Sequence, residues 1–434
     1  MKVKITEKLV SSLWQSRPVR YPVADTGEWL HVIFPGRASN FGGDFKDAVI
    51  GVNGRIVSGD IEVHVKSSQW QNHGHHQDTK YNNIVLHVVW QRDSHSATRL
   101  QNGRVIPTIA LEPLVTRPVT ELLKLHGSTP VSCPDNYLEV SALTTLLTRA
   151  GLKRFRNKST AFRRQMSKEN AEEVLYRGMA RALGYAQNAE PCQELSQRLP
   201  AAALKEYGQA SWLHRQALLL GHAGLLPSQR DRHIGDRTTT RLERIWRSTG
   251  ITDTMKSTDW CFFRVRPDNF PTRRLIALSH LLGRLGQSGL LSGILELVAQ
   301  APEDRGFRQM EEGLVVADDG YWQKHFDFGS FTGRSSALIG YEKASAMAIN
   351  IVLPFAAAFA RKSSDLELKK KAMEIYRLYP PRGENELTRF MRQQLNLPLN
   401  ARLSACQQQG LIHLFHTYCR LRNCLDCPVS LSPG

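Results

Sequence analysis

Two strand-like runs on either side of Asn53-Gly54 constrain the fold of this chain most. Residues 45–52 and residues 55–66 are rich in apolar and β-branched side chains. Asn-Gly is the pair that best fits the two central positions of a tight hairpin turn, where both residues take positive φ. The sequence therefore predicts an antiparallel hairpin over residues 45–66.

The second strand of this hairpin carries ionisable side chains on one face. Its last residues alternate between polar and apolar. In a strand, alternate side chains lie on one face, so the polar face carries Asp60, Glu62, His64 and Lys66. A further carboxylate, Asp44, comes just before the first strand. A solvated edge strand can show the same pattern, but several different ionisable groups beside another carboxylate favour a metal-dependent reaction centre.

The neighbouring sequence predicts further elements around the hairpin. Residues 4–15 have the apolar spacing of an amphipathic helix, and residues 28–34 predict a strand that ends at Pro35-Gly36. Residues 67–83 are polar and predict a loop with a short helix. Residues 84–90 are almost continuously apolar, which suits a strand at the centre of a sheet.

The whole chain predicts an α+β fold in three parts. We expect a mixed-sheet domain over residues 1–117, and a mostly helical, basic region over residues 118–400. A cysteine-rich, metal-binding segment is expected over residues 401–434. The 434 residues are enough for more than one hydrophobic core.

The charge balance predicts a polyanionic partner. The chain has 57 Lys and Arg against 40 Asp and Glu, a formal net charge of +17. We expect nucleic acid, in the first place DNA, and an anionic membrane surface is the alternative. The N-terminus lacks the apolar core of a signal peptide, and the longest apolar run, residues 346–360, is shorter than the roughly 20 residues that span a bilayer. A soluble cytoplasmic protein is the expectation.

Two basic segments are candidates for contact with phosphates. Residues 153–168 contain no acidic residue, and residues 264–274 place arginines around two prolines at the start of an apolar helix. The candidate nucleic-acid contacts are Arg154, Arg156, Arg163, Arg164, Arg264, Arg266, Arg273 and Arg274. The alternative for both segments is a solvated or salt-bridged face.

The order of elements and acids over residues 1–90 resembles the PD-(D/E)XK nuclease superfamily. That family has a helix glutamate, an aspartate at the start of the second strand and an acid-x-lysine triplet on the third. Here Glu7 stands for the glutamate and Asp44, within Gly-Asp-Phe, for the aspartate. Either residues 60–62 or residues 62–64 take the place of the triplet, with histidine or glutamate where the family has lysine.

Chemistry and resemblance together imply a Mg²⁺ or Mn²⁺ site for phosphodiester cleavage. The expected metal ligands are Asp44, Asp60 and Glu62. His64 is the expected general base, and Lys66 is expected to stabilise charge on the phosphate.

The polar loop after the hairpin holds further candidates. Gln77 and Tyr81 resemble the glutamine-x-x-x-tyrosine element of RecB-like nucleases. The same loop contains a cluster of metal-binding residue types within six positions: His73, His75, His76 and Asp78. This cluster could bind a transition metal or a phosphate. The alternative is a set of ordinary surface residues. His87, inside the apolar strand, is expected to be a hydrogen-bonded core histidine.

The chain also resembles the bacterial family labelled domain of unknown function 2851. The resemblance is carried by residues 43–45, residues 59–70, His73-Gly-His75, Tyr81-Asn82-Asn83, residues 182–185, Arg266-Pro267 and the C-terminal cysteines. It covers nearly the whole length and implies no particular activity.

The last cysteines predict a second metal site. Cys419, Cys424 and Cys427 follow Cys406 at spacings that are typical of zinc or an iron–sulfur cluster. If Cys406 is not a ligand, a histidine of residues 413–416 could supply the fourth donor. Reduced buried thiols are the alternative. The remaining cysteines, Cys133, Cys192 and Cys261, are expected to be ordinary thiols.

These observations favour a metal-dependent nuclease or a nuclease-derived protein that processes DNA. The alternative is a non-catalytic nucleic-acid-binding scaffold on a degenerate nuclease fold. A third possibility is a metal hydrolase for a small substrate, built on His64, His73, His75 and Asp78.

Overall fold

The computed structural model divides the chain into two compact units. It describes residues 4–16, 22–39, 42–115, 133, 138–185, 187–208, 212–263, 265–285, 289–302, 305–317, 320–333 and 336–431. The sheet unit comprises Met1–Leu146, Glu384–Ala401 and Leu411–Gly434, and the helical unit comprises Leu147–Gly383 and Arg402–Gly410. This division differs from the three predicted domains, because the predicted C-terminal segment is shared between the units: residues 402–410 belong to the helical unit and residues 411–434 to the sheet unit. Of the predicted site residues, Arg264 lies outside the described part of the chain.

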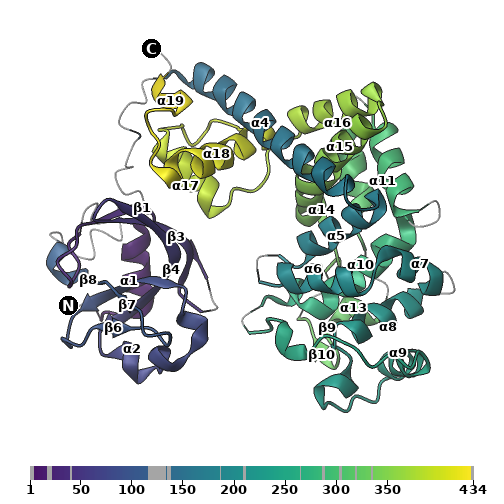
Figure 1. The fold of residues 1–434 in the computed structure, drawn as a ribbon, viewed down its shortest axis with the longest axis horizontal. Helices are drawn as coiled ribbons and strands as arrows, with labels where there is room; N and C mark the ends of the chain where they lie inside the picture. Colours follow the sequence, from purple (N-terminus) through teal and green to yellow (C-terminus); the bar gives the residue numbers. More distant parts are fainter. Residues whose placement is uncertain are drawn as a thin grey trace. The chain divides into compact units, whose positions relative to one another are not determined.

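A mixed sheet forms the core of the sheet unit (Figure 1). Its strand order is β1-β3-β4-β5-β8. The first three are antiparallel, whereas β5 and β8 run parallel to β4. The bounds are β1 Leu30–Phe34, β3 Phe45–Val52, β4 Arg55–Lys66, β5 Ile84–Gln91 and β8 Thr108–Ala110. The short strand β2 (Arg37–Ala38) pairs with β3, and β6 (Thr98–Arg99) pairs with β7 (Val105–Ile106).

The predicted hairpin is confirmed. Strands β3 and β4 meet at Asn53-Gly54, with Val52 opposite Arg55. Asn53 has φ of 46° and Gly54 has φ of 83°. Positive φ at both central residues is the mark of a type I′ turn, whose twist matches that of the two strands. The Asn-Gly pair therefore fixes the register that places the ionisable side chains of β4.

Helix α1 (Glu7–Ser16) packs on one face of this sheet. Its apolar side chains Val10 and Leu13 are buried in the same core as Ile61 and Val63 of β4. Because side chains alternate along a strand, the polar residues of β4 point to the opposite face. That face is covered by a second, smaller core, which contains Trp70, Ile84, Leu100 and Ile106.

The C-terminal elements of the sheet unit pack against its first strand. They are α17 (Glu386–Gln394), the last part of α18 (Ala405–Thr417) and the 3-10 turn η8 (Cys419–Leu421), and α19 (Pro428–Leu431) follows them in the chain. The ring of Phe34 lies 5.2 Å from that of Phe390 and 5.3 Å from that of Phe415. Edge-to-face packing of these rings joins β1 to helices that are distant in sequence.

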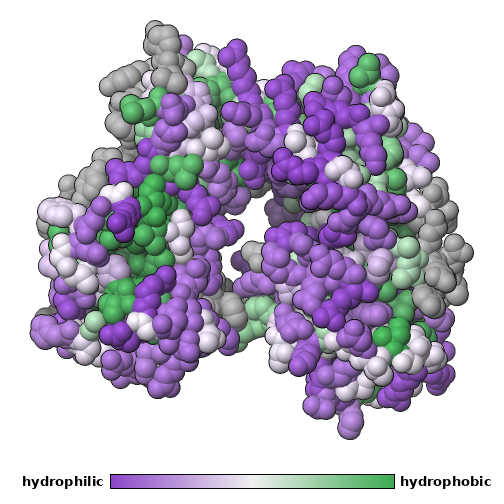
Figure 2. Space-filling model, in the orientation of Figure 1, coloured by the Kyte–Doolittle hydropathy of each residue, from purple (hydrophilic) through white to green (hydrophobic). Residues whose placement is uncertain are grey.

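The helical unit is built from helices that enclose one large core, so the predicted α+β class is confirmed (Figure 1). Its helices are α4 (Val140–Met166), α5 (Ala171–Leu183), α6 (Ala189–Arg198), α7 (Ala201–Gly208), α8 (Trp212–His222), α9 (Arg237–Ser248), α10 (Pro271–Leu285), α11 (Leu290–Ala299), α12 (Gly306–Leu314), α13 (Tyr321–Lys324), α14 (Tyr341–Met347), α15 (Leu353–Lys362) and α16 (Leu366–Leu378). A small hairpin pairs β9 (His325–Asp327) with β10 (Ser330–Phe331). Hydrophilic residues cover most of the visible face of this unit (Figure 2).

One helical stretch of the described residues is long and apolar enough to cross a membrane. It runs from Tyr341 to Lys362, and 78% of its apolar window is buried inside the fold. Pro354 has no N–H to continue the helical ladder, and a π-helical turn, η7 (Ala348–Val352), comes just before it. Its buried residues belong to the core of the helical unit, as expected for a core helix of a soluble protein. A cytoplasmic location stays a prediction.

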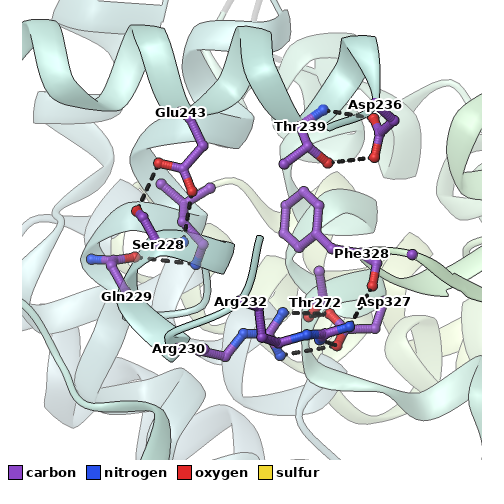
Figure 3. Close-up of polar contacts among 12 residues, drawn as sticks. Ser228, Gln229, Arg230, Arg232, Asp236, Thr239, Glu243, Thr272, Asp327 and Phe328 are labelled. Carbon is purple, nitrogen blue, oxygen red and sulfur yellow. Dashed lines mark hydrogen bonds and ion pairs between the residues drawn. The ribbon is translucent and has the colours of Figure 1, made fainter. Parts of the chain in front are cut away.

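A buried carboxylate ties the loops of the helical unit together. Asp327 accepts hydrogen bonds from Arg230 at 2.8 and 2.9 Å, from Arg232 at 2.8 Å and from Thr272 at 2.8 Å (Figure 3). Burial opposes its ionisation, but Arg230, Thr272 and the backbone N–H of Phe328 overcome this and lower the pKa of Asp327. Some arginines of this basic chain are therefore used in ion pairs inside its own fold.

Helices α4 and α18 touch at a glycine. A Cβ atom on Gly151 would lie 2.0 Å from the backbone oxygen of Cys406, which is far inside van der Waals contact. Glycine to alanine inside a helix ordinarily stabilises by roughly 0.5–1 kcal/mol. Here we expect Gly151→Ala to destabilise by about 1–3 kcal/mol, because backbone must move to admit the methyl group.

The measurement is the free energy of unfolding by denaturant, with Gly235→Ala as the matched control. A Cβ on Gly235 meets nothing within 4 Å. An unchanged or higher stability of Gly151→Ala would contradict the close approach of the two helices.

Lys158 of α4 predicts a pH dependence of stability. Its amine donates to Asn350 Oδ1, and burial, with the charge of Arg154, lowers its pKa from 10.5 to about 7. Between these two pH values the unfolded chain binds more protons than the folded chain, so stability rises with pH there. Removing the amine should therefore stabilise the protein more at pH 6 than at pH 9.

We expect Lys158→Met to gain on the order of 2 kcal/mol more at pH 6 than at pH 9, measured by denaturant unfolding at both pH values. Lys153→Met, at an exposed position of the same helix, should show no such difference. Equal gains for Lys158→Met at both pH values would rule out a buried amine with a lowered pKa.

Candidate metal centre

Strand β4 and the loop after it bring three imidazole rings together. His64 lies on β4, His73 ends α2 (Gln69–Asn72), and His75 begins the 3-10 turn η1 (His75–Gln77). One ring nitrogen from each residue lies within 4.8 Å of the other two. Three imidazoles with nitrogens this close are a donor set for a transition metal.

Two carboxylates border the imidazoles. Glu62 Oε1 lies 3.3 Å from His75 Nε2 and 3.8 Å from His64 Nε2. The backbone N–H of Asp44 donates to Glu62 Oε2 at 3.2 Å, and Asp44 Oδ2 accepts from the N–H of Val63 at 3.0 Å. The start of β3 and the middle of β4 therefore place Asp44 and Glu62 side by side at the imidazoles.

A chain of hydrogen bonds behind His64 can set its tautomer. His64 Nδ1 lies 2.9 Å from His87 Nε2, His87 Nδ1 lies 3.1 Å from Thr98 Oγ1, and Thr98 Oγ1 lies 2.8 Å from Thr108 Oγ1. If each group donates toward Thr108, Nε2 of His64 keeps its lone pair and faces His73 Nδ1 at 3.2 Å. A histidine that binds a metal through one ring nitrogen usually donates the N–H of its other ring nitrogen to a neighbouring group.

Burial favours the neutral form of His64, His75 and His87. Burial and the neighbouring rings of His87, His75 and His73 lower the pKa of His64 to about 2. Burial, with a smaller effect of His75, lowers the pKa of His87 to about 3. The pKa of His75 is also lowered by burial, against the opposing charges of Asp44, Asp78 and Glu7. Neutral imidazoles have the lone pairs that metal binding requires.

Local hydrogen bonds explain why the loop folds back over β4. Gln69 Oε1 accepts from the N–H groups of Val65 and Lys66 at 3.0 and 2.8 Å, and its amide donates to Glu7 Oε1 at 3.2 Å. The strand is thereby ended, and α2 is attached to α1. Gly74 then takes φ of 73°, a conformation that glycine adopts at little cost, and the chain reverses between His73 and His75.

The aromatic rings of Tyr81 and Trp70 pack against the imidazoles. The ring of Tyr81 lies 3.9 Å from that of His75, and the ring of Trp70 lies 5.4 Å from His75 and 5.2 Å from His87. Trp70 is itself fixed by a hydrogen bond from Nε1 to the backbone oxygen of Arg99 at 3.0 Å. The small second core thus excludes water from one side of the cluster.

The donor set fits a bound transition metal. Nε2 of His75 is buried and makes no hydrogen bond within the described residues, although it faces Glu62. A metal held by His64, His73, His75 and Glu62 would satisfy it. Imidazole ligands suit Zn²⁺ or Fe²⁺, and the Glu62 carboxylate is a ligand that also suits Mn²⁺, whereas Mg²⁺ prefers oxygen ligands alone.

Other predicted residues of this region have different roles. Asp60 is only 3% exposed, pairs with Lys46 at 2.5 Å and accepts from the N–H of Asp47, so its carboxylate is engaged away from the imidazoles. Asp78 caps the 3-10 turn η2 (Thr79–Tyr81) by accepting from the N–H of Lys80 at 2.9 Å. Lys66 and Gln77 are exposed.

The prediction that Arg273 and Arg274 contact nucleic acid is wrong for this fold. The two side chains are 0% and 4% exposed. Arg273 donates to the backbone oxygens of Trp322 and Ser336, and Arg274 to that of Leu338 at 2.5 Å. Their guanidinium groups are therefore used inside the helical unit, where no phosphate backbone can reach them.

The remaining predicted arginines differ in exposure. Arg154 is half-buried and donates to Gln409 Oε1 at 2.8 Å. The exposed ones, which stay candidates for contact with nucleic acid, are Arg156, Arg163, Arg164 and Arg266.

Cys406 is not placed with the other C-terminal cysteines. It belongs to the helical unit, is fully buried, and its thiol donates to the backbone oxygen of Thr148 at 3.7 Å. Cys419, Cys424 and Cys427 belong to the sheet unit. The spacing along the sequence suggested a common site, but α18 carries Cys406 into a different core.

Sequence reasoning missed the residues that support the imidazoles. His87 was expected to be a hydrogen-bonded core histidine, which is confirmed, but its contact with His64 was not foreseen. Gln69, Trp70, Thr98 and Thr108 act through tertiary contacts, and no motif in the sequence marks them.

A family model described as "Protein of unknown function (DUF2851)" matches residues 7–385. The chain belongs to this family. No curated protein and no solved structure matches the chain. The matched part of this DUF2851 protein contains the histidines and carboxylates of the candidate metal centre, whereas Cys419, Cys424 and Cys427 lie beyond it.

The hydrogen-bond chain behind His64 predicts that His87 supports metal binding without touching the metal. We expect His87→Phe to weaken the binding of Mn²⁺ or Zn²⁺ roughly 10–100-fold, because the tautomer and orientation of His64 are no longer fixed. Isothermal titration of the metal-free DUF2851 protein measures this affinity.

The matched control is His95→Phe, which changes an exposed histidine of the same unit. Circular dichroism of both variants reports whether the fold is kept. A folded His87→Phe variant that binds metal as tightly as the unchanged protein would show that the contact has no such role.

Proposed function

We propose that this DUF2851 protein is a metal-dependent hydrolase that cleaves phosphodiester bonds in nucleic acid, in the first place DNA. The observation that carries the proposal is the convergence of three imidazoles beside Glu62 and Asp44. Hydrolases that activate water at neutral pH often use such mixed imidazole and carboxylate sites.

The residues around the site suggest a division of roles. His64, His73, His75 and Glu62 would hold the metal, which when bound supplies a Lewis acid for a phosphoryl oxygen and for a water molecule. Mn²⁺ or Zn²⁺ suits these donors better than Mg²⁺ does.

Asp44 is a better general base than His64. Both ring nitrogens of His64 have close ring partners, and its pKa of about 2 makes it a weak base. Asp44 is half-buried and lies next to Glu62, so its carboxylate can accept a proton from water at the edge of the site. This assignment replaces the expected role of His64 as base.

The basic surface supports a polyanionic substrate. One face of helix α4 exposes a stripe of four basic side chains: Arg149, Lys153, Arg156 and Arg163. Together with the net charge of +17, this stripe supports electrostatic binding of a nucleic-acid backbone.

The test is cleavage of single- and double-stranded DNA by the full chain in the presence of Mn²⁺, Zn²⁺ or Mg²⁺. We expect cleavage with Mn²⁺ or Zn²⁺, and a loss of at least roughly 100-fold in Glu62→Gln, which keeps the shape of the side chain but removes its charge. Glu112→Gln, at an exposed glutamate of the same unit, should cleave like the unchanged protein.

A folded protein that binds DNA in a salt-dependent manner but cleaves none with any of the metals would contradict the proposal. That result would favour the alternative, a nucleic-acid-binding scaffold that has lost its chemistry. Cleavage of a small phosphodiester but not of DNA would contradict the substrate class and leave a small-molecule hydrolase.

A further inference from the structure

The helical unit contains a cleft that is lined chiefly by three of its helices. Its volume of about 680 Å³ is typical of a site for a small molecule. Helix α4, helix α5 and the continuous helix of α14 and η7 each line it with residues spaced three, four or seven positions apart, which is the spacing of one helical face. A Cβ atom on Gly178 of α5 would lie 3.4 Å from both Phe162 of α4 and Ile351 of η7, so the three helices meet beside the cleft.

The walls of the cleft are largely apolar. Val174 and Met347 are buried side chains of the large core, and Phe162 and Ile351 pack against that core. The ring of Phe162 is also in contact with the ring of Phe355, whose centre lies 5.6 Å away. A ligand with an apolar body would therefore leave water for walls that the core already supports.

Basic side chains outnumber acidic ones among the residues that line the cleft. The acidic one is Glu169, and its carboxylate accepts two hydrogen bonds from Arg177. Arg181 pairs with Glu190 at 2.7 Å. The basic lining residues are Lys158, Arg177, Arg181 and Lys343. Because each arginine has its own carboxylate, the surplus positive charge of the cleft is that of the two lysines.

The two lysines use neutral groups as partners. Lys158 donates to Asn350 Oδ1. Lys343 is 8% exposed, donates to the backbone oxygen of Ala182 at 3.2 Å and lies over the ring of Tyr185. Within the described part of the chain, neither amine forms an ion pair with a carboxylate. A buried ammonium group without a counter-charge is unfavourable, so the cleft is suited to a ligand that brings negative charge.

We propose that this cleft binds a small organic anion, that is, an apolar body with an acidic group for which Lys158 and Lys343 supply the opposite charge. The class includes apolar carboxylates, sulfonates and phosphate esters, since a lysine amine donates to the oxygens of each. All lining residues belong to the helical unit, whereas the candidate metal centre belongs to the sheet unit. The proposal therefore does not rest on the hydrolase activity proposed above.

Removal of the two amines should leave the fold intact. Burial, followed by the charges of Arg274 and Arg382, lowers the pKa of Lys343 to about 6, and burial with Arg154 lowers that of Lys158 to about 7. Folding is therefore not favoured by holding these two groups in their charged form. Methionine, which is of similar length and has no charge, is the suitable replacement.

The test compares two fluorescent dyes that share their rings. Anilinonaphthalene sulfonate carries an acidic group, and N-phenylnaphthylamine is the same molecule without it. The full chain should bind both in the cleft. In a double variant with Lys158→Met and Lys343→Met, we expect the sulfonate to lose roughly 10-fold or more in affinity, whereas the neutral dye should bind as before, because only the sulfonate pairs with the lysines.

Two further variants control for charge and for position. A second double variant, with Lys153→Met and Lys168→Met, removes the same charge at exposed positions in α4 and just after it, and it should bind both dyes like the unchanged protein. Ala346→Phe adds a ring to the lining of the cleft and should weaken the binding of both dyes at least several-fold.

Circular dichroism of each variant reports whether the fold is kept. The proposal is overturned if the unchanged protein binds neither dye, or if the variant without Lys158 and Lys343 binds the sulfonate as tightly as the variant without the two exposed lysines. Equal loss of sulfonate binding in both double variants would show attraction by net charge alone and would also overturn it. A folded Ala346→Phe variant that binds both dyes as before would place them outside the cleft, with the same consequence.

Discussion

Burial of β4 on both faces is the constraint on which the rest of the sheet unit depends. One face places Ile61 and Val63 in the core beneath α1, and the opposite face carries Glu62 and His64 beneath the smaller core around Trp70. Buried polar groups need partners, because an unpaired one costs about 1–3 kcal/mol. The loop after β4 supplies partners for these polar groups. The same strand that forms the fold therefore also carries the candidate metal centre.

That arrangement determines which donor atoms the candidate site would offer to a metal. His64 and His87 are kept neutral by burial, and the hydrogen bonds from His64 through His87 to Thr98 orient the ring from behind. A purely carboxylate site would suit Mg²⁺, but Asp60 is paired with Lys46 and is withdrawn from the imidazoles. The acidic strand face that first suggested a magnesium nuclease is thus a mixed imidazole and carboxylate site.

The basic segments show where reasoning from composition reaches its limit. Arg273 and Arg274 belong to a run that resembles a phosphate-binding patch, yet their partners are backbone oxygens of residues 322–338. No local pattern reveals such distant acceptors. The stripe on α4 differs, because helical spacing alone puts Arg149, Lys153 and Arg156 on one face, and neighbouring elements leave that face exposed.

The sequence by itself determined the features that depend on near neighbours. The Asn53-Gly54 turn, the alternation along β4 and the apolar strand β5 follow from backbone preference and side-chain periodicity, which act over a few residues. Only the tertiary structure decided that His87 contacts His64, that Asp60 pairs with Lys46, and that Cys406 belongs to a different unit from the last three cysteines. These outcomes depend on which distant segments pack together, and packing is set by the whole core rather than by local spacing.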